Sequence, residues 1–410
     1  MHVSPDIAAV ADEADFDGER LGRLSGVFRA DVERGVIPGA VVLVARHGKI
    51  AYHEAFGFRD RAREAAMRRD SIFRGASMTK PLVAVAAMML VEAGTLQLFA
   101  PISKYLPAFA GVQVGVEEVD RAGARTLRLE PPLREPSVQD LLRHTAGFTY
   151  GPFGDSLVQR MYREANAADP RQSNAEMAAT LARLPLAYQP GSTFEYGMSL
   201  DVLGAIVEAI SGSDLREYVR ERIAAPLAMS DTDFILAERD VDRLAEPHLD
   251  TTTGNNPLRF LYDPARPPAW FSGGGGILTT AGDYARFAQM LLDGGTFDGG
   301  RLLSRKIVEL MTCDHLPPGV GYGPFTRALG ITAPLPELGQ GFGLSMVVRK
   351  ERGRNPNPGS IGDFSWSGIS GTYWWADPRE HLVAVLMLAA PTLRVHYRTV
   401  MRDLVYAALR

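Results

Sequence analysis

A serine and a lysine three positions apart, in the tetrad Ser77-Met78-Thr79-Lys80, are the residues of this chain best suited to covalent chemistry. A serine hydroxyl is a weak nucleophile until a neighbouring base removes its proton. Residues three apart lie on one face of a helix, so an uncharged Lys80 amine can reach the Ser77 hydroxyl and act as that base. The tetrad predicts nucleophilic catalysis, while a helix-capping serine beside a surface lysine is the alternative interpretation.

The apolar segment after the tetrad predicts where this pair stands. Pro81 has no N–H to donate, so in a helix it belongs to the first turn. Gly94 is a typical residue at which a helix stops. We therefore expect a helix that begins near Ser77–Lys80 and ends at Gly94, with its amides and its positive dipole end close to the Ser77 hydroxyl.

Strand-like runs occur toward both ends of the chain. Ala40–Arg46 and Ile50–Phe58 flank a His-Gly-Lys turn and predict a β-hairpin. Further strands are expected at Phe342–Arg349, Ser370–Trp375 and Leu382–Leu388. Helices are expected at 16–36, Val138–Arg143, Asn174–Arg183, Leu200–Ile210, Leu215–Ile223, Ala281–Leu292, Arg305–Met311 and Leu393–Leu409.

This order of elements predicts an α/β fold of the α+β type. Strands at both termini form one antiparallel sheet flanked by helices, and a mostly helical domain is inserted between them. We expect a discontinuous sheet-containing domain at 1–85 plus 330–410, a helical domain at 86–329, and the active site between the two. The segment 111–136 is expected to be an insertion that covers the pocket or only the surface.

Composition limits the classes of function. With 46% hydrophobic residues the chain can bury a sizeable core, and a formal net charge of -4 argues against nucleic acid as the main partner. The single cysteine, Cys313, excludes an internal disulfide and fits a reducing compartment. The acidic N-terminal segment does not read as a signal peptide, and the longest apolar stretch is too short to span a membrane. We expect a cytoplasmic protein without membrane or nucleic-acid partners; the sequence does not reveal its oligomeric state.

Three later segments complete a pattern with the tetrad. They are Tyr196 at the start of a predicted helix, the stretch His144–Tyr150, and Trp366-Ser367-Gly368 followed by Ile369. In order and approximate spacing the pattern resembles the serine β-lactamase and penicillin-binding protein superfamily, whose three boxes are S-x-x-K, Y-x-N and K-T-G. The resemblance extends from about residue 20 to residue 405, and it implies that superfamily's fold.

The departures from this pattern bear on the substrate. Tyr196 is followed by Gly197 and Met198, so the asparagine of the second box is missing, and Trp366 stands where the third box has lysine. Tryptophan and methionine supply neither a cation nor an amide dipole, so we expect the pocket to favour neutral, apolar ligands over anionic peptide-like ones. The combination looks like the family VIII carboxylesterases, and related acyltransferases share much of it.

The resemblance implies roles for individual residues. Ser77 attacks an ester carbonyl, Lys80 accepts the proton, and Tyr196 passes a proton to the leaving alcohol, with the last two titrating as a unit. The backbone N–H groups of Ser77 and Ile369 are expected to bind the oxyanion. The residues expected to contact substrate are Tyr150, Met198, Trp366, Ser367 and Gly368. The alternative interpretation for Trp366 is core packing. The alternative interpretation for Tyr150 is a purely structural role.

The leading hypothesis is a serine carboxylesterase that hydrolyses small neutral carboxylic esters through an acyl-serine on Ser77. A β-lactamase or D-aminopeptidase-like hydrolase, an acyltransferase, and a sensor module that is acylated without turnover are the alternatives. The histidines show no metal-ligand spacing, so we expect neither metal nor cofactor. His144 is expected to have a structural hydrogen-bonding role. The run Gly273–Gly276 lacks the lysine of a phosphate loop and reads as a flexible turn.

Overall fold

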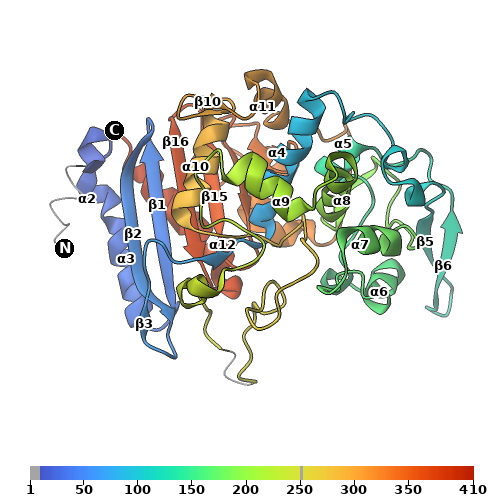
Figure 1. Cartoon of the computed structure of the whole chain (residues 1–410), viewed down its shortest axis with the longest axis horizontal. Coiled ribbons are helices and arrows are strands. Elements are labelled where there is room, and N and C mark those ends of the chain that lie inside the picture. The colour runs from blue at the N-terminus through green and yellow to red at the C-terminus, as the bar shows by residue number, and fades with distance from the viewer. Residues whose placement is uncertain (1–9, 250–252) are drawn as a thin grey trace.

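Both ends of the chain contribute to one eight-stranded antiparallel sheet (Figure 1). The computed structural model describes residues 10–249 and 253–410. Residues 1–9 of the acidic N-terminal segment, which is not predicted to be a signal peptide, lie outside the described residues. The strand order is β12-β13-β14-β15-β16-β1-β2-β3, and β1 pairs with β16 along its length, which joins the two ends of the chain. The predicted fold class is confirmed. The strands are β1 (Gly39–Arg46), β2 (Lys49–Asp60), β3 (Ala65–Ala66), β12 (Gln340–Phe342), β13 (Val347–Arg349), β14 (Phe364–Ser367), β15 (Tyr373–Asp377) and β16 (Leu382–Leu388).

Helices cover both faces of this sheet. On one face, α3 (Arg23–Glu33) and the C-terminal helix α12 (Arg394–Ala407) share a core cluster with alternate residues of β1 and β16. On the other, α10 (Ala281–Leu292) packs against β16, β1 and β15. The strands alternate their side chains between these two layers, which is why both β1 and β16 are buried throughout.

The helix that carries the tetrad lies at the centre of the molecule. A short 3-10 turn, Ala76–Met78, leads into α4 (Thr79–Glu92), and Gly94 follows with φ +73°. The predicted helix is thus confirmed, with Pro81 in its first turn. Eleven of its fourteen residues are buried, which explains why the segment is apolar on every side. It packs against α8 and α9.

Most of the remaining helices lie on the far side of α4 from β1 and β2, and α9 lies against α4 itself (Figure 1). Serines 137, 156 and 173 each form a capping box at the start of a helix there. The helices of this part are α5 (Val138–Leu142), α6 (Leu157–Glu164), α7 (Asn174–Leu181), α8 (Ser199–Ser211) and α9 (Leu215–Val219). The division into two domains stays a prediction; α10 belongs by sequence to the predicted helical domain but packs on the sheet.

Several element boundaries differ from those predicted. The expected strand Phe342–Arg349 is a hairpin of two short strands, β12 and β13, and Ser370–Thr372 forms a turn before β15 begins. The expected helix at 16–36 is divided at Gly22 into α2 (Gly18–Leu21) and α3. The helix expected at Leu215–Ile223 is α-helical only as far as Val219, where α9 ends, and it continues as a π-helix over Arg220–Ala224.

Several elements were not predicted, among them β14, α6 and a hairpin within the segment 111–136. β14 lies in the stretch before Gly368, and α6 lies in the stretch after Tyr150. The segment 111–136 forms a hairpin of β5 (Val114–Val119) and β6 (Arg125–Glu130) at the end of the molecule opposite α2 (Figure 1). Among the described residues, no helix is long and apolar enough to cross a membrane.

Candidate active site

The backbone around Ser77 is held in a strained conformation. Ala76, directly before it, has φ +48°, a left-handed conformation that costs a non-glycine residue about 1–3 kcal/mol and persists only where the surroundings impose it. Thr79 supplies part of that constraint, since its hydroxyl donates to the Ala76 carbonyl at 2.7 Å and accepts from the amide of Ile277 at 3.0 Å. The amide of Gly75 also donates to the Ile277 carbonyl. The nucleophile candidate is therefore fixed against a second segment of the chain.

Lys80 lies inside the protein with its amine among three oxygen atoms. Its side chain is fully buried, and Nζ lies 3.2 Å from the Ser77 hydroxyl oxygen and 3.2 Å from that of Tyr150. A shorter hydrogen bond of 2.6 Å joins Nζ to the carbonyl oxygen of Gly274. An uncharged amine has two N–H groups and one lone pair, so Nζ can donate to two of these oxygens and accept the proton of the Ser77 hydroxyl.

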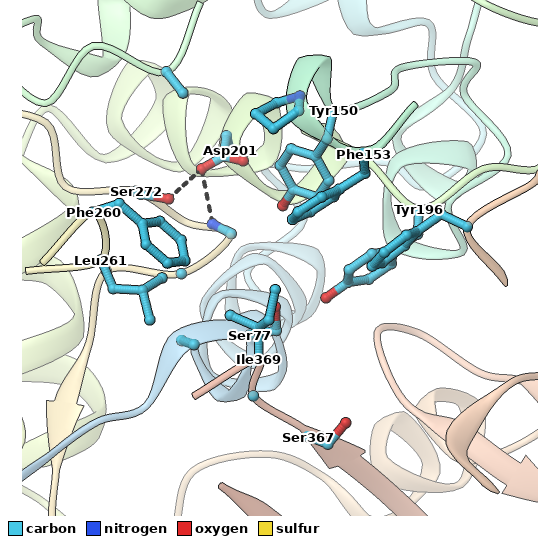
Figure 2. Close-up of a pocket in the computed structure, with 18 of the residues that line it drawn as sticks. Ser77, Tyr150, Phe153, Tyr196, Asp201, Phe260, Leu261, Ser272, Ser367 and Ile369 are labelled. Carbon is cyan, nitrogen blue, oxygen red and sulfur yellow. Dashed lines mark hydrogen bonds between the residues drawn. The ribbon is translucent and has the colours of Figure 1, made fainter. Parts of the chain in front are cut away.

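Asp201 holds the other side of the Gly274 segment. The side chain lies on α8 and is buried, and its Oδ1 accepts hydrogen bonds from the Ser272 hydroxyl at 2.6 Å and from the Gly274 amide at 2.9 Å (Figure 2). Burial raises the pKa of Asp201, although the nearby charge of Lys80 opposes that shift. A Cβ on Gly274 would lie 2.5 Å from Asp201 Oδ2, so the close approach requires glycine. The glycine run 273–276, interpreted from sequence as a flexible turn, is thus part of the site.

Two tyrosine hydroxyls point into the cavity above Ser77 (Figure 2). That of Tyr150 is engaged with Lys80, and burial together with the charge of Asp201 raises its pKa well above the ordinary value, which keeps it protonated. Tyr196 instead presents its ring to Lys80, with Nζ 4.6 Å from the ring centre, and its hydroxyl makes no hydrogen bond to a described residue. The structure therefore brings Ser77, Lys80 and Tyr196 together, but it links the amine to the hydroxyl of Tyr150 rather than to that of Tyr196.

The expected oxyanion donors also meet at this cavity. Ser77 and Ile369 both line it, and neither backbone N–H donates to another residue in the described parts of the chain. Gly368 allows the turn after β14 to approach, because a Cβ there would lie 2.4 Å from the carbonyl oxygen of Gly75. Two unengaged amides, one of them that of the nucleophile candidate itself, form an arrangement that can bind a carbonyl oxygen as it becomes negative.

The structure places the other residues expected to contact substrate at different depths. Ser367 and Gly368 line the cavity with Tyr150, whereas Met198 and Trp366 lie behind its wall with 1% and 0% of their surface exposed. The ring centre of Trp366 lies 5.4 Å from that of Tyr196. Because side chains alternate along a strand, β14 turns Ser367 to the cavity and Trp366 to the core. Trp366 supports Tyr196 from behind.

Apolar side chains form most of the remaining cavity wall. The rings of Phe153 and Phe325 both line the cavity and stack with their centres 4.5 Å apart. An apolar wall of this kind favours esters with hydrocarbon substituents. No cavity-lining residue comes from 111–136, so that insertion does not cover the pocket. The apolar wall contains Phe153, Phe260, Leu261, Trp270, Phe325 and Leu329.

The side chain of His144 packs against its neighbours and does not have the hydrogen-bonding role predicted for it. Neither ring nitrogen has a partner in the described structure, and burial lowers the pKa of the imidazole well below its ordinary value. Its ring packs 4.7 Å from that of Tyr196, and its backbone carbonyl accepts from the amide of Glu195. His144 thus fixes Tyr196 in place. Among the described residues, no cluster of three or more His, Cys, Asp and Glu side chains could hold a metal ion.

Comparison with known proteins gives consistent matches over nearly the whole chain. A family model described as Beta-lactamase matches residues 24–404. Esterase EstB of Burkholderia gladioli is 31% identical over 408 residues, which cover 94% of this chain and 95% of EstB. Among solved structures, EstCE1, a hydrolase with promiscuous acyltransferase activity, has a TM-score of 0.76 and 27% identity, with 95% of this chain and 99% of EstCE1 covered. Simvastatin synthase (LovD) from Aspergillus terreus has a TM-score of 0.77 and 25% identity, with 95% and 98% covered.

Proposed function

We propose that this chain, which belongs to the beta-lactamase family and is a serine hydrolase, cleaves small carboxylic esters through an acyl-enzyme on Ser77. The observation that carries the proposal is the position of the Lys80 amine, 3.2 Å from the Ser77 hydroxyl at the wall of an otherwise largely apolar cavity. A base must lie within hydrogen-bond reach of the proton that it accepts, and this amine does. The name of its relative esterase EstB agrees with this choice of substrate class.

The acylation step assigns one task to each side chain. Ser77 Oγ attacks the ester carbonyl carbon while Lys80 Nζ takes its proton, and the carbonyl oxygen becomes negative beside the amides of Ser77 and Ile369. The bond to the alcohol oxygen then breaks. Tyr196, whose hydroxyl is not engaged with another described residue, gives its proton to the departing alkoxide, and the proton that Lys80 took from Ser77 replaces it. Tyr150 keeps its own proton and holds the amine in place.

Deacylation repeats these proton transfers with water in place of serine. Lys80 accepts a proton from the water as its oxygen attacks the acyl carbon, and the ester bond to Ser77 breaks. Lys80 returns this proton to the Ser77 oxygen, and the net reaction converts one ester and one water into a carboxylic acid and an alcohol. An alcohol that enters the same position instead of water would give acyl transfer, a second candidate function that the promiscuous acyltransferase activity of EstCE1 favours.

The test is turnover of p-nitrophenyl butyrate combined with mass spectrometry of the quenched protein. We expect steady release of p-nitrophenolate, a transient butyryl group on the peptide that contains Ser77, and loss of both in Ser77→Ala. A single equivalent of release without steady turnover would contradict an esterase and support the sensor alternative. Turnover of a chromogenic cephalosporin at a comparable rate would favour the β-lactamase alternative, and the methyl or ethyl ester formed in added alcohol measures acyl transfer.

A further inference from the structure

Two buried arginines on helix α12 differ in their partners. Arg398 and Arg402 are each only 2% exposed and lie four residues apart, on one face of the helix. Arg402 is neutralised by Asp363, to which its Nη1 lies at 2.9 Å, and its Nε donates to the Tyr373 hydroxyl. Arg398 donates from Nη2 to the carbonyl oxygen of Gly368 at 2.6 Å, while its Nε has no acceptor in the described structure. No carboxylate of a described residue forms an ion pair with it.

An unneutralised guanidinium inside a protein is costly because its charge is removed from water. Burial, with the charge of Arg394 adding to it, lowers the pKa of Arg398 to about 9. The ring of Tyr373, 5.9 Å from the guanidinium carbon, offers a weak compensating contact. Buried charges in proteins are normally paired, so a buried cation without a protein anion indicates that a ligand supplies the anion.

The position of Arg398 in the cavity indicates which class of ligand supplies the anion. Arg398 and Arg394 line the same cavity as Ser77, on the side formed by the turn Ser367–Ile369. Arg394 is the first residue of α12, bonds only to the Pro391 carbonyl one turn back, and forms no ion pair with a described carboxylate. The positive end of a fourteen-residue helix therefore adds to the two guanidinium charges at this side of the cavity. Much of the remaining wall is apolar, although the buried Asp201 also lines the cavity.

We propose that Arg398, with Arg394 beside it, is a subsite for a free carboxylate carried by the ester substrate. The substrate class is thus an ester with a hydrocarbon portion for the apolar wall and an anionic group for the arginines. The planar guanidinium matches a carboxylate in geometry, and charge-assisted hydrogen bonds of this kind are about twice as strong as neutral ones. The inference rests on the proposed esterase function and replaces the expectation of a neutral substrate, which was based on the missing lysine at Trp366.

The test compares esters that differ only in whether a carboxylate is charged. One pair places the group on the acyl side, mono-p-nitrophenyl glutarate and its methyl ester; the other places it on the alcohol side, 3-acetoxybenzoate and its methyl ester. We expect kcat/KM for the charged member to exceed that of the neutral member by about tenfold or more in at least one pair. Arg398→Gln should lower that ratio toward one, whereas Arg379→Gln, at an exposed arginine in the β15–β16 turn, should leave it unchanged.

The ratio of kcat/KM between the charged and the neutral ester reports on this subsite and not on the catalytic centre. Gln can still donate to the Gly368 carbonyl, and any damage to the oxyanion hole affects both members of a pair equally, so it cancels. If Arg398→Gln does not fold, Arg394→Gln, which is only half-buried, must lower the ratio in its place. A ratio unaffected by these substitutions in both pairs would overturn the subsite and leave the esterase intact. If none of the four esters is hydrolysed, the esterase proposal fails. The subsite is then tested by calorimetry: glutarate should bind to Ser77→Ala, and adding Arg398→Gln should weaken that binding.

Discussion

The amine of Lys80 lies 2.6 Å from the carbonyl oxygen of Gly274, and this is the shortest of its hydrogen bonds. The two residues are 194 positions apart in the sequence. Because the Gly274 amide is in turn bound by Asp201, a buried carboxylate fixes the peptide unit that fixes the amine. The orientation of the base candidate therefore depends on a residue that touches neither Ser77 nor the substrate carbonyl.

Asp201 is consequently a positioning residue, and its substitutions should separate hydrogen bonding from charge. Asparagine keeps the Oδ1 acceptor for Ser272 and Gly274, so we expect Asp201→Asn to retain kcat within about threefold. Asp201→Ala leaves both donors without an acceptor and should lower kcat by about tenfold or more while KM changes little. The measurement is steady-state hydrolysis of p-nitrophenyl butyrate by both variants, after circular dichroism confirms that each is folded. Equal losses in the two variants would show that the charge matters and not the held peptide.

Lys80 should be irreplaceable as a base, even by another cation. We expect Lys80→Ala to lower kcat by about 10³-fold, within the range typical of general-base catalysis. Lys80→Arg preserves a positive charge, but an arginine keeps its proton at neutral pH and cannot act as the base, so kcat should fall by a similar factor. Turnover rates of the two variants, measured on one ester, decide the point. An active arginine variant would mean that the residue acts through its charge and that the proton goes elsewhere.

The two tyrosines should differ in their dependence on the leaving group. If Tyr196 protonates the departing alkoxide, Tyr196→Phe should lower kcat/KM by about 10²-fold or more for ethyl butyrate and much less for p-nitrophenyl butyrate, whose phenolate leaves without a proton. Tyr150→Phe removes a partner of Lys80 instead, so both esters should lose the same factor. Measuring both esters with both variants gives four ratios. A leaving-group dependence in Tyr150→Phe and none in Tyr196→Phe would exchange the two roles.

The local part of this site could be predicted from the sequence because it depends on short-range rules. Pro81 restricts the helix start, so the sequence predicts correctly that Ser77 lies directly before α4 and Lys80 in its first turn. The β1–β2 hairpin is set by its turn in the same way. Features that depend on residues close in sequence, or on a pattern shared with a known family, are therefore accessible from the amino-acid sequence alone.

The parts that escaped prediction depend on contacts between distant segments. Asp201, Gly274 and Arg398 carry no local signal, since an acid on an amphipathic helix and a run of glycines are ordinary features. The face to which Trp366 points could not be decided either, because β14 is four residues long and was not predicted as a strand. With its strand unknown, the alternation that turns Ser367 toward the cavity and Trp366 away from it could not be applied.

Glu195, next to Tyr196, should make stability depend on pH. Burial raises its pKa to about 7 from 4.5, against the opposing hydrogen bond that the Thr149 hydroxyl donates to Oε1 at 2.7 Å. The folded protein thus holds a proton that the unfolded chain has lost between these two pH values, so stability is greatest below about pH 4.5 for this group and falls as pH rises toward 7. The loss is on the order of 3 kcal/mol.

Glu195→Gln isolates this contribution, because the amide oxygen can still accept from Thr149 while no charge can form. We expect the variant to gain stability over the unsubstituted protein at pH 8 and to lose that advantage at pH 5, as measured by urea unfolding at both pH values. Glu164→Gln, at an exposed glutamate at the end of α6, is the matched control and should behave like the unsubstituted protein at both. An advantage of Glu195→Gln that is the same at pH 5 and pH 8 would mean that the side chain is already charged at the lower pH.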